Sequence, residues 1–412
     1  MASKSCIQFS SESAISPLGA LALFSPRSWL ASFARQSILS TLSSSIAVGY
    51  LVVDDAEGSH TYGTLKKGCN YVHIKVKCDN FWLRLILSGD LGFSEAYMIG
   101  EIELPDLRAA MNTKSNARLN VIASYDQSNE LFKAFLSSEM MYSCALWDES
   151  EGGVRGDLEI SGEKLHHVLR QARLKPGYRV LEFGSGWGGL AIEAASTFGC
   201  TVDTLTLSIE QKTLAEERIA AAGLSDKIRV HLLDYRDIPS EWENAFDAFV
   251  SVEMLEHVGS KHYSNYFRLV SFALKPHNAT AVVSASTFPE SRYSSYQAED
   301  FMRKYMWPNS CLPSASALIQ AASPHFNLER VENHAAHYPR TLREWGRRLE
   351  KNLTQEMVAK DYAGLNDKQS YEAFKRKWMY LFAYAGAGFA KGYITCHMLT
   401  FIRENDAPEI CD

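Results

Sequence analysis

The pattern of apolar and polar positions becomes regular after residue 175. Short apolar runs then alternate with longer segments that carry apolar residues at helical spacing. The predicted strands are 178–183, 200–207, 227–234 and 246–252, and the predicted helices between them are 190–199 and 208–223. Strands that alternate with helices of this length predict an α/β fold, a mostly parallel sheet with helices on both faces. The late segments 326–335 and 392–402 are predicted to add strands at the sheet edge.

The first part of the chain has a different pattern. Four short runs between residues 49 and 87 are separated by glycines and by Asp79-Asn80, which predicts four strands. Residues 1–45 predict an amphipathic helix whose apolar face would hold Trp29, Leu30, Phe33, Ile38 and Leu42. The same segment is Ser-rich and has Glu12 as its one acid, so a transit peptide is the alternative. The polar stretch 113–120 divides an accessory region, 1–115, from a second domain, 116–412.

Composition narrows the function classes. The 412 residues are 46% hydrophobic and 22% charged, which is typical of a globular protein. A net charge of −6 argues against nucleic-acid binding through the overall field. The 8 scattered cysteines include no C-x-x-C pair, so we expect no metal site, no disulfide framework and a cytoplasmic location, with mitochondrial targeting left open. No uncharged apolar run reaches the roughly 20 residues of a membrane-spanning helix, and 378–390 is predicted to be a buried helix.

A glycine-rich turn predicts a nucleotide-type cofactor site. The turn 184–189 satisfies G-x-G-x-x-G, and Asp203 follows about 20 residues later, which taken alone favours NAD. Three features argue otherwise. Glu182 ends the strand with a carboxylate, Trp187 would crowd a pyrophosphate, and Asp203 falls inside the next strand. These features favour a nucleoside cofactor without a pyrophosphate, as in enzymes that use S-adenosylmethionine (SAM).

The ordered motifs of the chain resemble those of the cyclopropane-fatty-acid synthases and mycolic acid cyclopropane synthases. Those motifs are 81–103, 125–147, 180–195, 204–211, 232–237, 246–259, 301–314, 337–345 and 374–389. The resemblance implies a class I SAM-methyltransferase (Rossmann-like) fold with a lipid-facing lid at about 285–325. It implies SAM-dependent C-methylation of a double bond in an unsaturated acyl chain, with cyclopropanation as the default outcome. It also implies a lipid partner and peripheral membrane contact, to which Arg303 and Lys304 would contribute, and it leaves a homodimer open.

The resemblance assigns residues to SAM by position. The residues that would contact the cofactor are Tyr142, Ser143, Gly184, Gly186, Thr206, Leu207, Gln211, Asp234 and Tyr235. Thr206, Leu207 and Gln211 would hold the ribose and nearby groups, and Asp234 and Tyr235 would frame the adenine.

The resemblance also implies a catalytic bicarbonate ion that acts as a base. Cys144, Glu256, Ser284 and Tyr338 would hold it, with Ser286 nearest to the backbone contact. Ser284 stands where bacterial members of the family have a histidine, and a serine cannot carry a positive charge. This departure predicts weaker bicarbonate binding, and methyl-branched or methylene products beside or instead of a cyclopropane.

Other interpretations remain open at the level of sequence. An isolated cysteine such as Cys144 is usually an ordinary buried residue, and Glu256 could simply favour the start of a helix. Ser124 and Gly386 also depart from the family pattern. The alternatives are therefore C-methylation of a sphingolipid, polyketide or other specialised metabolite without ring closure, or a non-catalytic protein that binds SAM or lipid. A dehydrogenase is the weakest alternative.

Overall fold

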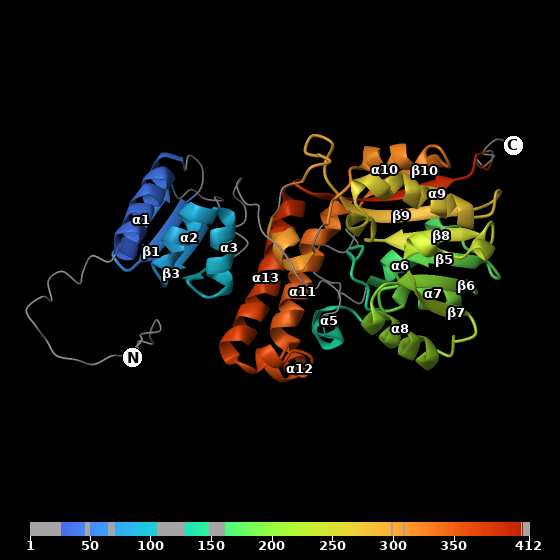
Figure 1. Cartoon of the computed structure of the whole chain (residues 1–412), viewed down its shortest axis with the longest axis horizontal. Helices are drawn as coiled ribbons and strands as arrows, with labels where there is room; N and C mark the ends of the chain where they lie inside the picture. The colour runs from blue at the N-terminus through green and yellow to red at the C-terminus, as the bar shows by residue number, and fades with distance from the viewer. Residues whose placement is uncertain are drawn as a thin grey trace, which may run out of the picture.

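Two sheets and a layer of helices organise the computed structural model (Figure 1). The structure describes residues 26–45, 50–64, 71–104, 128–147, 161–297, 300–307, 310–404 and 406. In Figure 1 the N-terminal unit lies at one end of the molecule, the seven-stranded sheet lies at the other, and the long C-terminal helices lie between them. The predicted boundary at 113–120 and Ser124 fall outside the described residues, as do residues 1–25 of the segment 1–45, for which a transit peptide was the alternative.

The large sheet confirms the predicted α/β class. Its strand order is β10-β11-β9-β8-β5-β6-β7. The strands are β5 (Arg179–Phe183), β6 (Thr201–Thr206), β7 (Ile228–Leu232), β8 (Ala248–Val252), β9 (Thr280–Thr287), β10 (Asn327–Asn333) and β11 (Thr395–Ile402). Neighbouring strands pair in parallel through the order β9-β8-β5-β6-β7, and β11 is antiparallel to both of its neighbours. Of the two late strands, β10 forms the edge and β11 lies one place inside it.

Helices cover both faces of this sheet, as the alternating pattern predicts. The helices are α6 (Ser161–Gln171), α7 (Gly189–Ser196), α8 (Ile209–Ala221), α9 (Tyr263–Ala273) and α10 (Ala315–Ala322). Leu165, Leu190 and Ala215 from the first three share one buried cluster with strand side chains. Phe267 and Leu318 from the last two belong to the cluster on the other face. The sheet is therefore held between two apolar layers, and its strand ends are left to build a site.

The N-terminal unit corrects two sequence predictions. It contains α1 (Pro26–Ser45), β1 (Tyr50–Asp55), β2 (Gly58–Gly63), β3 (Tyr71–Val76), α2 (Asn80–Ser88), α3 (Asp90–Met98) and β4 (Ile102–Glu103). The run 81–87 was predicted to be a strand and is helix α2, because Phe81 and Trp82 are buried together while Ile86 and Leu87 are exposed, which is not a period of two. The helix at α1 is confirmed, but Leu30 is 46% exposed and Phe33 is 57% exposed, so neither lies on the buried face.

The remaining helices form an aromatic layer beside the large sheet. They are α5 (Asn129–Phe135), α11 (Tyr338–Asn352), α12 (Gln355–Ala359) and α13 (Lys368–Ala390), and α13 contains the predicted buried helix. Phe135 packs against Trp345 and Trp378, with ring centroids 5.7 and 5.6 Å apart. Arg376 joins this layer to the N-terminal unit, because its guanidinium donates hydrogen bonds to the carbonyls of Tyr97 and Ile102. Among the described helices, none has the length and apolar character needed to cross a bilayer.

Candidate active site

A cavity of about 840 Å³ opens at the carboxyl ends of β5, β6 and β8. This is the edge of a parallel sheet where ligands bind in open α/β folds. Its walls come from the strand ends, from the segment between β9 and α10, and from α11 and α13. Its size is at the upper end of the range for small-molecule sites, roughly 300–1,000 Å³. The cavity therefore joins the glycine-rich turn to the aromatic layer.

Most of the residues predicted to bind SAM line this cavity. They are Tyr142, Gly184, Gly186, Thr206, Leu207, Gln211 and Tyr235. The backbone of the turn is left-handed at Gly184 (φ +93°) and Gly186 (φ +47°), and a Cβ built on Gly186 would meet no atom within 4 Å. The Thr206 hydroxyl donates a 2.8 Å hydrogen bond to the Gln211 side-chain oxygen, which fixes both side chains at the end of β6.

Two of the residues predicted to bind SAM are engaged elsewhere. Asp234 is not among the residues that line the cavity, and its carboxylate accepts hydrogen bonds from Arg236. Ser143 is buried behind the cavity wall and accepts a hydrogen bond from Lys164. Asp203 is likewise committed to Arg179 and His231, so it is unavailable to the ribose of a dinucleotide. This arrangement supports the argument against NAD.

Glu182 brings a buried carboxylate to the cofactor end of the cavity. The residue lines the cavity, is 4% exposed, and its Oε2 atom has no hydrogen bond of normal geometry among the described residues. Burial raises the pKa of this carboxyl to about 7. A cation placed beside Glu182 would favour its ionised form, and SAM carries both an ammonium and a sulfonium.

We therefore expect SAM binding to tighten as the pH rises from 6 to 8. With a pKa of about 7, Glu182 is mostly protonated at pH 6 and mostly ionised at pH 8. Binding should strengthen by up to about tenfold over this range, because one pKa unit corresponds to a factor of ten. Titration calorimetry in two buffers with different ionisation enthalpies should also show proton release at pH 6. Equal affinities at the two pH values in the native protein, or an unchanged pH dependence in Glu182→Gln, would contradict this assignment.

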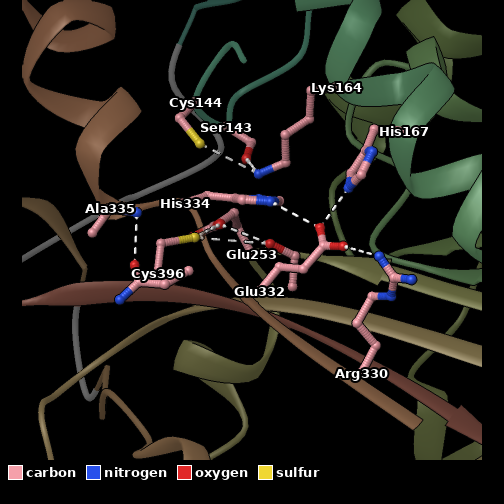
Figure 2. Close-up of polar contacts among 12 residues, drawn as sticks. Ser143, Cys144, Lys164, His167, Glu253, Arg330, Glu332, His334, Ala335 and Cys396 are labelled. Atoms are coloured by element: carbon pink, nitrogen blue, oxygen red, sulfur yellow. Dashed lines mark hydrogen bonds and ion pairs between the residues drawn. The ribbon is translucent and has the colours of Figure 1, made fainter. Parts of the chain in front are cut away.

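A second group of polar side chains lies at the carboxyl ends of β8 and β9 and includes a fully buried cation (Figure 2). Lys164, on α6, is 0% exposed and donates to the Ser143 hydroxyl at 2.9 Å and to the Cys144 sulfur at 3.4 Å. Although burial opposes it, a hydrogen bond with Cys396 and the positive charge of Lys164 lower the pKa of the Cys144 thiol. Cys396, from β11, contacts the same group and donates to Glu253 at 3.3 Å.

Two carboxylates, Glu253 and Glu256, meet in this group. Glu253 Oε2 accepts hydrogen bonds from the Ser286 hydroxyl at 2.8 Å and from the Ser286 backbone N–H at 3.2 Å. Its Oε1 accepts a longer hydrogen bond, 3.4 Å, from Ser284. Glu256 Oε1 accepts from the same backbone N–H, while its Oε2 is buried and has no donor facing it among the described residues.

The environment separates the pKa values of the two carboxyls. Although burial opposes it, Lys164 holds the pKa of Glu253 below its usual range, aided by hydrogen bonds from Glu256, Ser286 and Cys396. Burial and the neighbouring Glu253 charge raise the pKa of Glu256 well above its usual range. At neutral pH Glu253 is therefore ionised, and Glu256 is protonated and donates to it.

Tyr338 completes the wall of the cavity beside these carboxylates. Its ring stacks on Phe389 with centroids 4.0 Å apart and an angle of 3° between the planes. Burial and the nearby negative charges, Glu253 first among them, raise the pKa of the hydroxyl well above its usual value. Tyr338 therefore stays protonated and can act only as a neutral hydrogen-bonding group near neutral pH.

The structure brings the predicted catalytic residues together, but they do not fit a bicarbonate ion as predicted. Glu256 and Tyr338 line the cavity, whereas Cys144 and Ser284 are buried behind it. Three of the predicted contacts, those from Ser284, the Ser286 N–H and Glu256, are directed at the Glu253 carboxylate. An anion on the same donors would overlap a side chain that is already negatively charged.

Sequence reasoning missed Glu253, Lys164 and Cys396. The signal for Glu253 was present, because it precedes Glu256 by three residues at the end of a predicted strand. Lys164 had no such signal, since it belongs to the polar sequence SGEKLHHVLR, which resembles a solvated helix. Gly386, which departs from the family pattern, packs on Leu342 rather than lining the cavity.

Two further predictions meet the structure near this site. Arg303 was predicted to contact lipid headgroups, but its guanidinium donates hydrogen bonds to the backbone carbonyls of Gln297 and Ser310 and so supports the cavity wall.

The second prediction concerns a metal site. Near Lys164, the potential ligand atoms of His167, Glu332 and His334 all lie within 4.8 Å of one another (Figure 2). Arg330 also pairs with Glu332. The expectation of no metal site stays a prediction.

Comparison with known proteins gives a consistent result. A family model described as mycolic acid cyclopropane synthetase matches residues 112–399. The chain is 34% identical to cyclopropane-fatty-acyl-phospholipid synthase of Escherichia coli, over 76% of this chain and 84% of that protein. It is 32% identical to tuberculostearic acid methyltransferase of Mycobacterium tuberculosis, over 77% and 79% of the two chains. The solved structure of a cyclopropane synthase from M. tuberculosis matches with a TM-score of 0.58 at 22% identity, covering 67% of this chain and 95% of that one.

Proposed function

The chain belongs to the mycolic acid cyclopropane synthetase family, and from this premise we propose how its cavity serves the reaction. The protein is a SAM-dependent methyltransferase of the cyclopropane-fatty-acyl-phospholipid synthase type that acts on unsaturated lipids. SAM is held at the end formed by the glycine-rich turn, Glu182, the Thr206–Gln211 pair and Tyr235. The double bond of the acyl chain lies between that end and Glu253.

One observation carries this proposal: a single cavity connects the cofactor end, the two carboxylates and an apolar wall. Leu342, Leu381 and Tyr384 contribute to that wall from α11 and α13, and Trp307 contributes from the segment before α10. An extended acyl chain is apolar along its length, so an apolar and aromatic wall suits it. Holding the double bond against the SAM methyl group supplies the alignment that a weak nucleophile such as an alkene needs.

The chain's own residues then have distinct tasks. The alkene attacks the SAM methyl carbon, the bond from that carbon to sulfur breaks, and a carbocation is left on the acyl chain. The rings of Tyr384 and Trp307 line the cavity where they can stabilise this cation through their faces. Release of a proton from the new methyl group closes a cyclopropane, and release from a carbon next to the cation leaves an alkene. A hydride shift that moves the cation to the methyl-bearing carbon, followed by release of a methyl proton, leaves a methylene product. From the same premise we also propose that the protein contacts a lipid surface peripherally, that it forms a homodimer and that it is cytoplasmic.

Labelled methyl transfer tests the proposed function directly. The purified chain should transfer label from methyl-labelled SAM to vesicles of monounsaturated phospholipid and release S-adenosylhomocysteine in equal amount. Vesicles of saturated phospholipid of the same headgroup are the matched control and should take up no label. Mass spectrometry of the released fatty acids separates cyclopropane, methylene and methyl-branched products. Label on saturated chains, or on a small soluble acceptor in place of lipid, would contradict the proposal.

A further inference from the structure

Glu253 is half-buried and lines the cavity, whereas two of the donors that hold it, Ser284 and Cys396, lie behind the cavity wall. Ser284 is 1% exposed and Cys396 is 0% exposed, and both donate to Glu253 Oε1. Ser286 supplies its hydroxyl and its backbone N–H to Oε2. The Glu253 carboxylate is therefore held in place by hydrogen bonds and faces the space in which we place the acyl chain.

The backbone at Glu253 has an unusual conformation that directs its side chain toward the cavity. Its φ is +55°, the left-handed region that residues with a side chain seldom adopt. Its N–H donates a 2.8 Å hydrogen bond to the carbonyl of Ser284, which fixes the turn against β9. Unfavourable backbone conformations persist where the surrounding structure enforces them, and they concentrate at functional sites. Here the unfavourable backbone aims a carboxylate into the cavity.

Charge and protonation around Glu253 suit a proton acceptor. The buried ammonium of Lys164 keeps Glu253 ionised near neutral pH, and the protonated Glu256 donates to it. Two neighbouring carboxyls with separated pKa values are a common arrangement for acid and base roles. Among the described residues that line the cavity, the other carboxyls are less suited: Glu182 lies at the cofactor end, and Asp300 has its pKa raised by burial.

We propose that Glu253 is the base of this reaction, a carboxylate built into the chain at the place where the family resemblance puts bicarbonate. This role rests on the proposed function. After methyl transfer, a Glu253 oxygen takes a proton from the new methyl group, and the electron pair of that C–H bond forms the closing bond of the ring. Removal from the neighbouring carbon forms a double bond instead. In both cases the cation is neutralised and Glu253 becomes a neutral carboxylic acid.

Chemical rescue tests the proposal with three forms of the full chain: native, Glu253→Gly and Glu253→Gln. Rates are measured with labelled SAM and monounsaturated phospholipid vesicles in buffer stripped of carbon dioxide, with and without added bicarbonate or formate. The native rate should not respond to either anion. Both variants should lose about 100-fold or more, the range typical of a missing general base. Glu253→Gly should regain at least about tenfold with the anions, whereas Glu253→Gln should not, because its amide still fills the site.

Controls separate this role from a structural one. Glu329→Gln makes the same chemical change at a carboxylate on β10, outside the cavity, and should leave the rate unchanged. SAM binding by calorimetry should be native-like in Glu253→Gly and Glu253→Gln. A native rate that rises several-fold with bicarbonate, or a Glu253→Gln variant that keeps its rate, would overturn the proposal. Native protein that transfers no label to unsaturated lipid would instead overturn the proposed function, and this role with it.

Discussion

Replacing Gly186 with valine is expected to weaken SAM binding by about 100-fold or more, equivalent to about 2.7 kcal/mol. Gly186 lines the cofactor end of the cavity, and a Cβ built on it meets no atom within 4 Å. A side chain there would enter the space in which the cofactor approaches the backbone of the turn. Close approach of a ligand to backbone is one of the positions where only glycine fits. Titration calorimetry with SAM measures the loss.

Gly223→Val provides a matched control for that substitution. Gly223 follows α8, away from the cavity, and also has a left-handed backbone (φ +70°) with no atom near its Cβ position. A valine at either site carries the same kind of backbone strain, about 1–2 kcal/mol. Both variants should therefore lose similar thermal stability, but only Gly186→Val should lose SAM affinity. A parallel loss of affinity in Gly223→Val would show that strain, rather than obstruction of the site, explains the result.

The core of the fold was predictable because its strands are buried on both faces. Apolar runs such as 178–183, bounded by Pro176-Gly177 and a glycine turn, allow few other interpretations. The prediction for 81–87 was wrong because six apolar residues around a single arginine show no clear period. Arg84 now pairs with Glu101, a contact 17 residues away that no local pattern contains. Tertiary packing, rather than the apolar run itself, determines that this segment is a helix.

The two ends of the candidate site also differ in how far the sequence predicts them. The cofactor end was predictable because Glu182, Gly184 and Thr206 lie at or just beyond the carboxyl ends of adjacent parallel strands, which share one edge of the sheet. The polar group around Glu253 draws on four segments that are distant in sequence. Lys164 reaches it from a helix whose sequence is polar throughout, and Cys396 comes from the last strand. Only tertiary packing brings the buried ammonium of Lys164 and the thiols of Cys144 and Cys396 to the same place.

Replacing Lys164 with methionine, a side chain of similar length, is expected to lower both stability and activity. Lys164 acts on Glu253 through its charge, while its hydrogen bonds go to Ser143 and Cys144. Removing a buried charge that balances another costs up to about 3–5 kcal/mol. The cost here should be at the lower end, because Glu253 can take up a proton once the ammonium is gone. The same proton removes the ionised base, so the rate near neutral pH should fall by about 10-fold or more for each unit by which the pKa of Glu253 exceeds the assay pH.

The direction of the pH effect follows from the shift at Glu253. Its pKa in the native protein lies below its usual range, so its charge stabilises the fold above that range and this stabilisation is lost as the pH falls through the native pKa. In Lys164→Met, the effect of burial, which raises the pKa of Glu253, is no longer opposed by a cation. The acid limb of the pH–rate profile should therefore move to higher pH, with activity partly recovered in alkaline buffer. A uniform loss of rate with an unmoved acid limb would assign Lys164 a structural role only.

The double variant Lys164→Met/Glu253→Gln separates stability from chemistry. Replacing both members of a buried pair leaves no uncompensated charge, and such replacements are often neutral or stabilising. Urea unfolding should therefore show the double variant recovering most of the stability lost by Lys164→Met alone, a coupling that distant and independent residues do not show. Its activity should stay as low as that of Glu253→Gln, and alkaline pH should not restore it, because no carboxylate remains to be ionised. Recovery of activity together with stability would contradict the role of Glu253 as the base.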